Sequence, residues 1–511
     1  MAEQSGISRR IAPLDDLGLA VLAFLISIPL SAQTRAADEA AARERGASVP
    51  AETALLLAGK PFPSPAAAPT RLPEPRRTFF VAPGPENGDG SEKRPWNDLP
   101  TALRALEPGD RLRLRAGRYA GPVAIDEACR DGRAASPIQV VFDKKAVLEA
   151  PDSGAALTLR RAHWHLVGVL VELADSEATG IALEAGAREV TLEGARVAGG
   201  TGPGIRVGPG VAGARIETAR VSKSRVEHPG PASIGIQVLA GSANVVVAGN
   251  RLHENPAGSL RVEAPGPDER PAREIVIEGN AIYDDDSTEI RVAAADGLRV
   301  IGNTISDQAG RRDTRGVVLE RVSHAVVRSN HVERCALGLQ IGRAGAGAEN
   351  HPAEDVTIDH NVIENTPGSG TAIAIEAGNG IRFVNNLVSD CANGILVLGA
   401  PPETRNVIAA NNILLGVTGT ALRLSDSSSV SEFDYNVFAP AGASVVEVAG
   451  QREALVRWVK ANLPHSAVVP RARMLGHDVA RIEGVPTVDR GRRIDGVAFL
   501  GAAPDIGVAE K

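Results

Sequence analysis

The chain has 511 residues, with 55 Lys and Arg against 62 Asp and Glu, and a formal net charge of −7 at pH 7. This balance argues against nucleic acid as a partner, and an acidic polymer would need a locally basic surface. Aromatic residues make up 3% of the chain and 54 positions are Gly, a composition that suits thin repeated coils better than a large globular core.

Residues 1–36 have the pattern of an export signal. Arginines precede an apolar stretch from Leu17 to Leu30, which is short for a membrane span, and small residues follow it. The pattern predicts a cleaved signal peptide and a periplasmic or secreted protein, with an uncleaved N-terminal anchor as the alternative. Residues 37–77 are rich in Ala and Pro and are expected to form a disordered linker.

Residues 78–142 are expected to form an N-terminal cap and the first rung of a coil. A strand at Phe79–Val81 leads into a Gly- and Asn-rich loop, and a short amphipathic helix is expected from Pro100 to Leu106. Stacked repeats need their open ends covered. We therefore expect this helix to close the N-terminal end.

Residues 143–440 carry a repeat marked by asparagine. Short alternating apolar segments, rich in Val and Ile, end at an Asn that is followed by further apolar residues. The ladder asparagines are Asn250, Asn280, Asn303, Asn330, Asn361, Asn386, Asn412 and Asn436. A repeat of this length predicts a stacked solenoid, and period-two alternation between turn residues predicts short strands.

The predicted fold is an all-β parallel β-helix of about eleven or twelve rungs, with about three short strands per rung and rungs roughly 4.8 Å apart. Stacked Asn amides can hydrogen-bond from rung to rung, and Asn also tolerates the left-handed turn conformation. Upstream, Ala195 and Ala219 occupy the ladder position. Residues 441–511 are expected to form a closing cap that includes a helix from Gln451 to Asn462.

The three cysteines are expected to be thiols. Cys335 and Cys391 both lie five residues after a ladder asparagine, two rungs apart. Two rungs span roughly 9.6 Å, which is beyond the reach of a disulfide.

The segment from Val81 to Tyr119 also resembles the opening segment of a known group of proteins. Its motifs are Val81-Ala82-Pro83, Asn87-Gly88-Asp89-Gly90, Pro95-Trp96, Gly109-Asp110 and Gly117-Arg118-Tyr119. With the Asn-bearing rungs they resemble the right-handed parallel β-helix proteins of the pectate-lyase-like superfamily, and within it the secreted bacterial proteins related to chondroitinase B and alginate lyase. The resemblance implies a right-handed coil and action on carbohydrate. The Lys and Arg motifs of those lyases are not found here, so no mechanism is carried over.

Candidate binding residues lie on strands of the form Gly-apolar-x-apolar, whose middle residues should point outward together. The predicted substrate-binding residues are Arg206, Gln237, Arg261, Arg291 and Gln340. The catalytic candidates are Arg261, Arg291, Glu263 and Glu320. Stacked arginines can hold successive carboxylates by forked hydrogen bonds, and such charge would stabilise the enolate formed during β-elimination. The alternative is a solvated strand face of Arg–Glu pairs.

A second cluster consists of Asp284, Asp285 and Asp286, in the loop after Asn280. Oxygen-rich clusters of this kind can bind Ca²⁺, although no EF-hand spacing supports it. A polar, solvated loop is the alternative.

Two hypotheses for function remain open. The first is an exported monomer that binds an acidic polysaccharide (a uronan) and cleaves it by lyase-type β-elimination. The second is a non-catalytic carbohydrate-binding or surface-structural solenoid.

Overall fold

The computed structural model describes residues 72–174, 176–222, 233–266, 269–285, 287–307, 313–343, 352–364, 366, 368–469, 490–494 and 506. The predicted signal peptide and nearly all of the predicted linker lie outside these residues. Within them, no helix has the length and apolarity needed to cross a membrane.

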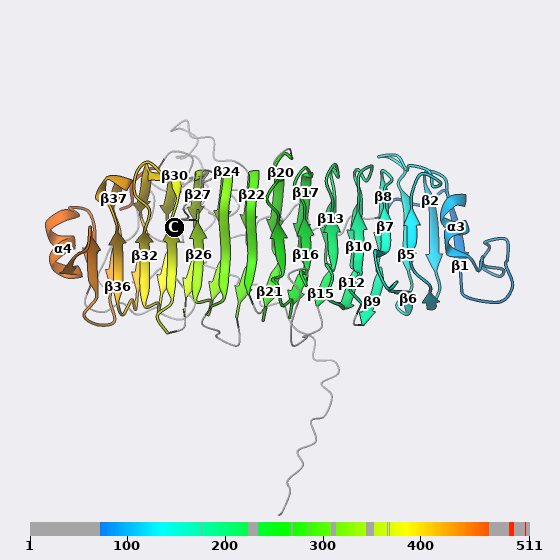
Figure 1. Ribbon diagram of the computed structural model, residues 1–511, viewed down its shortest axis with the longest axis horizontal. Coiled ribbons are helices and arrows are strands. Elements are labelled where there is room, and N and C mark those ends of the chain that lie inside the picture. The colour runs from blue at the N-terminus through cyan, green and yellow to red at the C-terminus, as the bar shows by residue number, and fades with distance from the viewer. Residues whose placement is uncertain are drawn as a thin grey trace, which may run out of the picture.

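The strands wind into one elongated coil of about 13 turns (Figure 1). Each regular turn places one strand in each of three stacked columns, which we call faces 1, 2 and 3. Neighbouring turns pair in parallel, so that faces 1 and 2 form one 27-stranded sheet and face 3 forms a 14-stranded sheet. The predicted parallel β-helix is confirmed, and it has more turns than expected because the N-terminal turns lack the asparagine that made the others countable.

Face 1 consists of β4 (Val123–Ile125), β7 (Ala155–Leu159), β10 (Thr179–Leu183), β13 (Ile205–Val207), β16 (Ile236–Val238), β19 (Leu260–Val262), the first parts of β22 (Thr288–Ile301) and β24 (Arg315–Arg328), β26 (Leu337–Ile341), β29 (Thr371–Ile375), β32 (Asn393–Val397), β36 (Thr420–Leu424) and β39 (Val445–Val448).

Face 2 consists of β1 (Arg77–Val81), β2 (Asp110–Leu114), β5 (Ile138–Phe142), β8 (Trp164–Val167), β11 (Thr191–Glu193), β14 (Arg215–Glu217), β17 (Ala243–Ala248), β20 (Ala272–Glu278), the second parts of β22 and β24, β27 (Ala353–Asp359), β30 (Gly378–Val384), β33 (Thr404–Arg405), β34 (Val407–Ala410) and β37 (Val430–Asp434).

Face 3 consists of β3 (Gly117–Tyr119), β6 (Ala146–Glu149), β9 (Leu170–Ala174), β12 (Arg196–Gly199), β15 (Arg220–Ser222), β18 (Arg251–His253), β21 (Ala281–Tyr283), β23 (Thr304–Ser306), β25 (His331–Glu333), β28 (Val362–Glu364), β31 (Leu387–Ser389), β35 (Ile413–Leu415), β38 (Val437–Ala439) and β41 (Ala467–Val468). A 3₁₀ turn, η1 (Ser427–Ser429), lies between β36 and β37.

Apolar side chains stack in rows inside the coil. On face 1, Val207, Val238, Val262 and Val292 are cross-strand neighbours in four successive turns and are almost fully buried. Each buried Val stabilises the fold by roughly 1.5 kcal/mol or more. Since side chains alternate along a strand, the residues between these valines face outward.

The asparagines form a continuous ladder at the turn between faces 2 and 3. Asn330 Oδ1 accepts hydrogen bonds from the backbone N–H and the side-chain amide of Asn303, both at 2.9 Å. The Asn330 amide in turn donates to Val300 O and to Asn361 Oδ1, each at 2.9 Å. The same pattern links every ladder position from Asn250 to Asn436, so the predicted ladder is confirmed.

The ladder Asn does not itself take the left-handed conformation that this residue type tolerates. The residue before it does so, as Gly249 (φ 61°), Gly279 (φ 60°) and Ser329 (φ 54°) show. Asn is therefore used for its side chain, because its amide both donates and accepts in line with the stack.

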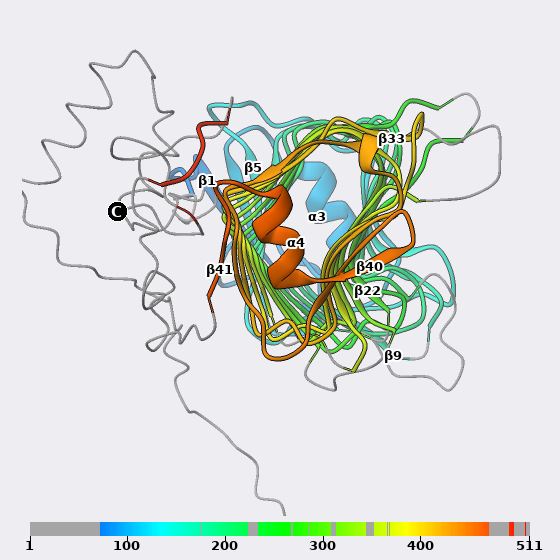
Figure 2. The same cartoon turned by 90° about the vertical axis from the view of Figure 1, so that its left-hand side faces the viewer.

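Helices close both ends of the coil (Figure 2). At the N-terminal end, α3 (Leu99–Ala105) begins at Asp98, whose side chain accepts from Thr101 N at 2.9 Å, and it buries Leu99 and Leu103. At the other end, α4 (Leu455–Asn462) buries Leu455 and Val459. The helix expected from Gln451 begins four residues late because β40 (Gln451–Ala454) pairs antiparallel with β39.

Parts of the C-terminal tail lie against the side of the coil. Val469 and Ile506 pack on apolar residues of face 3 in the last turns. Ile494 packs on Val384 and Ala410, and Asn411 exchanges two hydrogen bonds with the backbone of Arg492 (2.7 and 2.8 Å).

All three cysteines are buried, unpaired thiols, as expected. Burial raises the pKa of each thiol, so these side chains act as small apolar groups.

Candidate functional site

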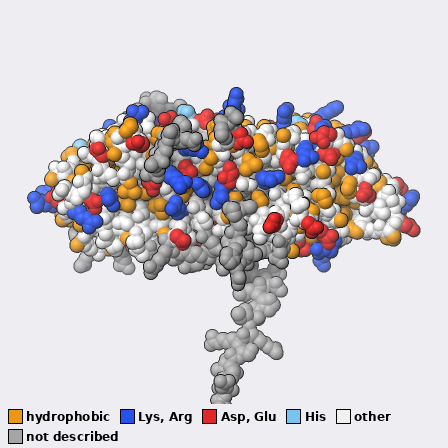
Figure 3. Space-filling model, in the orientation of Figure 1, with side chains coloured by type: hydrophobic (Ala, Val, Ile, Leu, Met, Phe, Trp, Pro, Cys, Tyr) orange, Lys and Arg blue, Asp and Glu red, His pale blue; other side chains and the backbone are white. Residues whose placement is uncertain are grey.

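Four of the predicted binding residues form one row across the middle of face 1. Arg206, Gln237, Arg261 and Arg291 are direct cross-strand neighbours in β13, β16, β19 and β22. Each occupies the outward position between two buried residues of its strand. We call these four residues the face 1 row. Figure 3 shows basic and acidic side chains mixed over the middle of the surface in this view.

The carboxylates of this surface are tied to the members of the row. Arg291 donates two hydrogen bonds to Glu320 Oε1, at 2.8 and 3.1 Å. Gln237 donates to Glu263 Oε1 at 3.0 Å, and Arg206 lies 3.5 Å from Glu184. Much of the row therefore has the Arg–Glu pairing that the alternative interpretation expected.

Arg261 differs from the other two arginines of the row. Its Nη2 donates to the backbone oxygen of Ala257 at 2.8 Å, and within the described residues it has no ion pair. Burial lowers the pKa of its guanidinium and the charge of Arg291 adds to this effect, while Glu263 and Glu320 act in the opposite direction. A half-buried cation with unused donors is a favourable place for an incoming anion.

Gln340 does not join the row. It lies two strands beyond Arg291, with Val318 between them, and it is 5% exposed. Its Oε1 accepts from Arg315 Nη1 at 2.9 Å, so its amide is already engaged within the protein.

The four catalytic candidates lie on one surface of the coil. Arg261, Arg291, Glu263 and Glu320 have no hydrogen bond or ion pair to an Asp or His within the described ranges. The general base of an elimination reaction would then have to come from these four residues themselves.

The acidic cluster after Asn280 is divided by the wall of the coil. Asp284 is half-buried at a left-handed position (φ 62°), whereas Asp285 is fully buried and Asp286 lies outside the described residues. Burial raises the pKa of Asp285 to about 7. Both interpretations of the cluster, a surface calcium site and a solvated loop, placed Asp285 at the surface, and its burial contradicts this. Calcium binding here stays an untested prediction.

Asp285 has an acidic neighbour inside the coil. Glu289 is also fully buried, and its pKa is raised well above the ordinary value by burial and then by the charge of Asp285. Asp285 Oδ1 accepts from Asn255 N at 2.8 Å. Glu289 therefore lies inside the coil and not on the surface that carries the face 1 row.

On face 3, His331, Glu333 and Glu364 form the group best suited to a metal among the described residues. One ligand atom from each lies within 4.8 Å of the others. His331 Nε2 is 2.7 Å from Glu364 Oε1, and this carboxylate raises the pKa of His331. The contact serves equally as an ordinary His–Glu ion pair.

Sequence reasoning missed a second arginine row, on face 3. Arg196, Arg220 and Arg251 are cross-strand neighbours in β12, β15 and β18. Each directly follows a ladder position, which is Ala195, Ala219 or Asn250. That recurrence was the signal in the sequence that could have revealed them.

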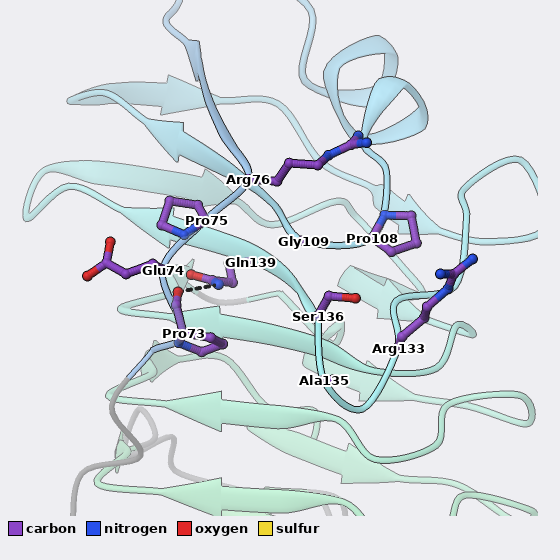
Figure 4. Close-up of a pocket in the computed structure, with 10 residues that line it drawn as sticks. All are labelled: Pro73, Glu74, Pro75, Arg76, Pro108, Gly109, Arg133, Ala135, Ser136 and Gln139. Carbon is purple, nitrogen blue, oxygen red and sulfur yellow. Dashed lines mark hydrogen bonds between the residues drawn. The ribbon is translucent and has the colours of Figure 1, made fainter.

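An open pocket of about 390 Å³ lies near the N-terminal end, away from both arginine rows. Figure 4 shows the segment Pro73–Arg76 along one side of it, held where Gln139 donates to Pro73 O at 2.9 Å. Across the pocket lie Ser136 and Arg133. No catalytic combination of side chains lines it, so the face 1 row remains the candidate site.

Comparison with known families agrees with this architecture. A family model described as the right handed beta helix region matches residues 269–369. The chain is a right-handed parallel β-helix. No curated protein matches this β-helix.

Several solved structures share the fold of this β-helix. PfbA, a surface adhesin of Streptococcus pneumoniae, is 12% identical over 70% of this chain and 89% of its own, with a TM-score of 0.50. Pectate lyase Pel9A is 14% identical over 86% of this chain and 97% of its own (TM-score 0.42). An alginate lyase from Paenibacillus sp. str. FPU-7 is 18% identical over 63% and 96% (TM-score 0.38). A likeness at this identity concerns the fold alone and leaves the activity open.

Proposed function

We propose that this β-helix is an exported protein that binds an acidic polysaccharide along the face 1 row. The predicted signal segment supports export, and the arginines at rung spacing support an anionic, repeating ligand. A linear chain of uronic acids would lie across the turns, parallel to the axis of the coil, and would present one carboxylate after another to the row.

Arg261 is the observation that carries the proposal. It stands at the centre of the row, between Gln237 and Arg291, and its charge has no ion-pair partner among the described residues. Partial burial reduces its hydration, so a carboxylate that reaches it forms a stronger charge-assisted hydrogen bond than it would in open solvent. Gln237 and Arg291 are already held in place by Glu263 and Glu320 and need little reordering.

Cleavage by β-elimination is the second candidate. In that reaction a base removes the C5 proton, its electron pair forms the C4=C5 double bond, and the C4–O bond to the leaving sugar breaks as that oxygen takes up a proton. The positive charge of Arg261 favours this candidate, because it would stabilise the enolate that forms as the C5 proton leaves. Among the described residues no Asp or His is bonded to the row, and this favours binding without turnover.

The test compares the same Arg-to-Gln substitution at two positions of face 1. Arg261→Gln removes the central charge, and Arg423→Gln removes an exposed arginine further along, which is paired with Glu447. We expect Arg261→Gln to weaken binding of polygalacturonate and alginate oligomers about tenfold, equivalent to about 1.4 kcal/mol, in calorimetric titration. Arg423→Gln should stay within about twofold of the unchanged protein. Equal affinities for all three proteins would refute the proposal.

Turnover is tested separately with the unmodified protein. Incubation with alginate, polygalacturonate and chondroitin sulfate is followed by the ultraviolet absorbance of the unsaturated product. Absorbance that grows with one substrate, and is lost in Arg261→Gln, assigns elimination to the row. Binding without any absorbance change leaves a non-catalytic binding protein.

A further inference from the structure

The arginine row of face 3 is exposed and lacks acidic partners. Arg196, Arg220 and Arg251 occupy equivalent outward positions in three successive turns. Within the described residues none of them forms an ion pair, and Arg251 directs its Nε to the hydroxyl of Tyr283. Three positive charges therefore stand roughly 4.8 Å apart along the backbone stack, and none of them is ion-paired to a carboxylate of the described residues.

This arrangement is unusual for the chain itself. Several other outward arginines are matched by carboxylates on adjacent turns, as Arg113 is by Asp143 at 2.8 Å and Arg118 is by Glu149. Arg261 of the face 1 row is a further arginine without an ion pair among the described residues. Like charges that face each other across neighbouring strands destabilise a sheet. The face 3 row thus costs some folding stability, which the binding of an anion would offset.

An aromatic platform adjoins the row. His253 of β18 and Tyr283 of β21 are cross-strand neighbours on face 3, two residues along each strand from the position of the row. Their rings stack with centroids 5.0 Å apart and planes 3° apart. The guanidinium of Arg251 lies 5.2 Å from the centre of the Tyr283 ring. Aromatic rings beside polar donors suit sugars, which present an apolar ring face and polar edges.

Along face 3 the basic residues give way to a group that contains carboxylates, and this change marks the end of the basic surface. After Arg251 the same column continues with Ala281 and Thr304, and then reaches His331 beside Glu364. The acidic group repels an anion, so a bound polyanion would be confined to the turns that carry the arginines. In the last turns the face becomes apolar and is covered by Val469 and Ile506.

We propose that Arg196, Arg220 and Arg251, together with Tyr283, form a second binding surface for an acidic polysaccharide. The three guanidinium groups take carboxylate or sulfate groups, and a sugar ring packs on Tyr283. Since this surface and the face 1 row belong to different sheets of the coil, one molecule would hold two polysaccharide segments at once. The inference does not depend on the face 1 row.

The test uses two triple variants that remove the same charge. One replaces Arg196, Arg220 and Arg251 with Gln. The matched control replaces Arg104, Arg188 and Arg405, which are exposed at scattered positions outside the row. Heparin and polygalacturonate are the probes, and duplex DNA of equal charge is the comparison. Binding is measured by calorimetric titration at two salt concentrations.

We expect the face 3 triple variant to lose one of two binding steps in the titration with each polysaccharide, or to weaken that step about tenfold or more, while both steps of the control triple stay within about twofold. Tyr283→Ala should also weaken binding, although it changes no charge. The face 3 triple should unfold at the same temperature as the unmodified protein or at a higher one, because the row is self-repelling.

Four results would overturn the proposal. Equal losses in the two triple variants would mean that net charge alone attracts the probes. Preferential binding of duplex DNA that is lost in the face 3 triple would assign the row to nucleic acid. A fall in unfolding temperature that accounts for the lost binding would make the row structural. An effect of Arg261→Gln with none from the face 3 triple would uphold the face 1 proposal alone, and the reverse result would uphold this one alone.

Discussion

Asp285 and Glu289 place two carboxyl groups side by side inside the coil, where a charge is costly. Burial raises the pKa of both groups, and each carboxyl acts on the other. At neutral pH the pair therefore retains a proton that free carboxyl groups would have lost. The hydrogen bond from Asn255 N keeps Asp285 in place, so the pair belongs to the wall of the coil beneath the surface that carries Arg261 and Arg291.

This pair makes stability depend on pH. The pKa of Asp285 rises from an ordinary 3.8 to about 7 in the folded state, so between about pH 4 and pH 7 the folded chain holds a proton that the unfolded chain has released. The stabilisation of the folded state by this bound proton is fully present below about pH 4 and is lost as pH rises through 7. We expect Asp285→Asn, which keeps an oxygen for Asn255 N, to raise the free energy of unfolding at pH 8 by about 1–3 kcal/mol.

Urea unfolding at pH 4 and pH 8 measures this difference. The gain should shrink at pH 4, and the Asp284→Asn variant, at a half-buried position, should show little change at either pH. A stabilisation by Asp285→Asn that is equal at both pH values would contradict the assignment.

At the scale of elements, the turn between faces 2 and 3 joins the rungs through a chain of amides. Asn330→Ala removes the acceptor for Asn303 N and for the Asn303 amide, and the donor to Val300 O and Asn361. Several buried polar groups lose their partners. We expect a loss of about 2–4 kcal/mol in the free energy of unfolding, measured by chemical denaturation. Asn462→Ala, at an exposed asparagine at the end of α4 and outside the ladder, should cost about 0.5 kcal/mol or less.

The elements were largely predictable because the repeat carries two independent signals, the Asn period and the alternation of Val and Ile. The alternation also placed Arg206, Gln237, Arg261 and Arg291 in one register, which the strand pairing reproduces. The fate of Asp285 was not predictable. The left-handed conformation of Asp284 turns the following side chain inward, and three identical residues in a row give no sign of which one lies inside. The pairing of Glu320 with Arg291 depended on side-chain geometry across turns, which no spacing specifies.

At the scale of the whole molecule, stability depends on two covered ends. Open ends would expose unpaired strand edges and the apolar interior. Val459 lies on the buried side of α4, whereas Val456 on the same helix is 59% exposed. We expect Val459→Asp to loosen this cap and to cause end-to-end association, seen as larger species in light scattering. Val456→Asp should behave as the unchanged protein does, and identical behaviour of the two variants would argue that α4 is dispensable.

Because the ladder repeats the same hydrogen bond at every turn, a whole turn can be deleted or duplicated in the gene without breaking the ladder. A deletion of residues 304–330 would join Asn303 to His331. Since His331 begins β25 and is the cross-strand equivalent of Thr304, which begins β23, the amide chain could close again between Asn303 and Asn361. The wall would survive, but Arg291 would lose Glu320. Gain or loss of single turns thus offers a route by which such a protein changes the length and charge of its surfaces while its scaffold stays intact.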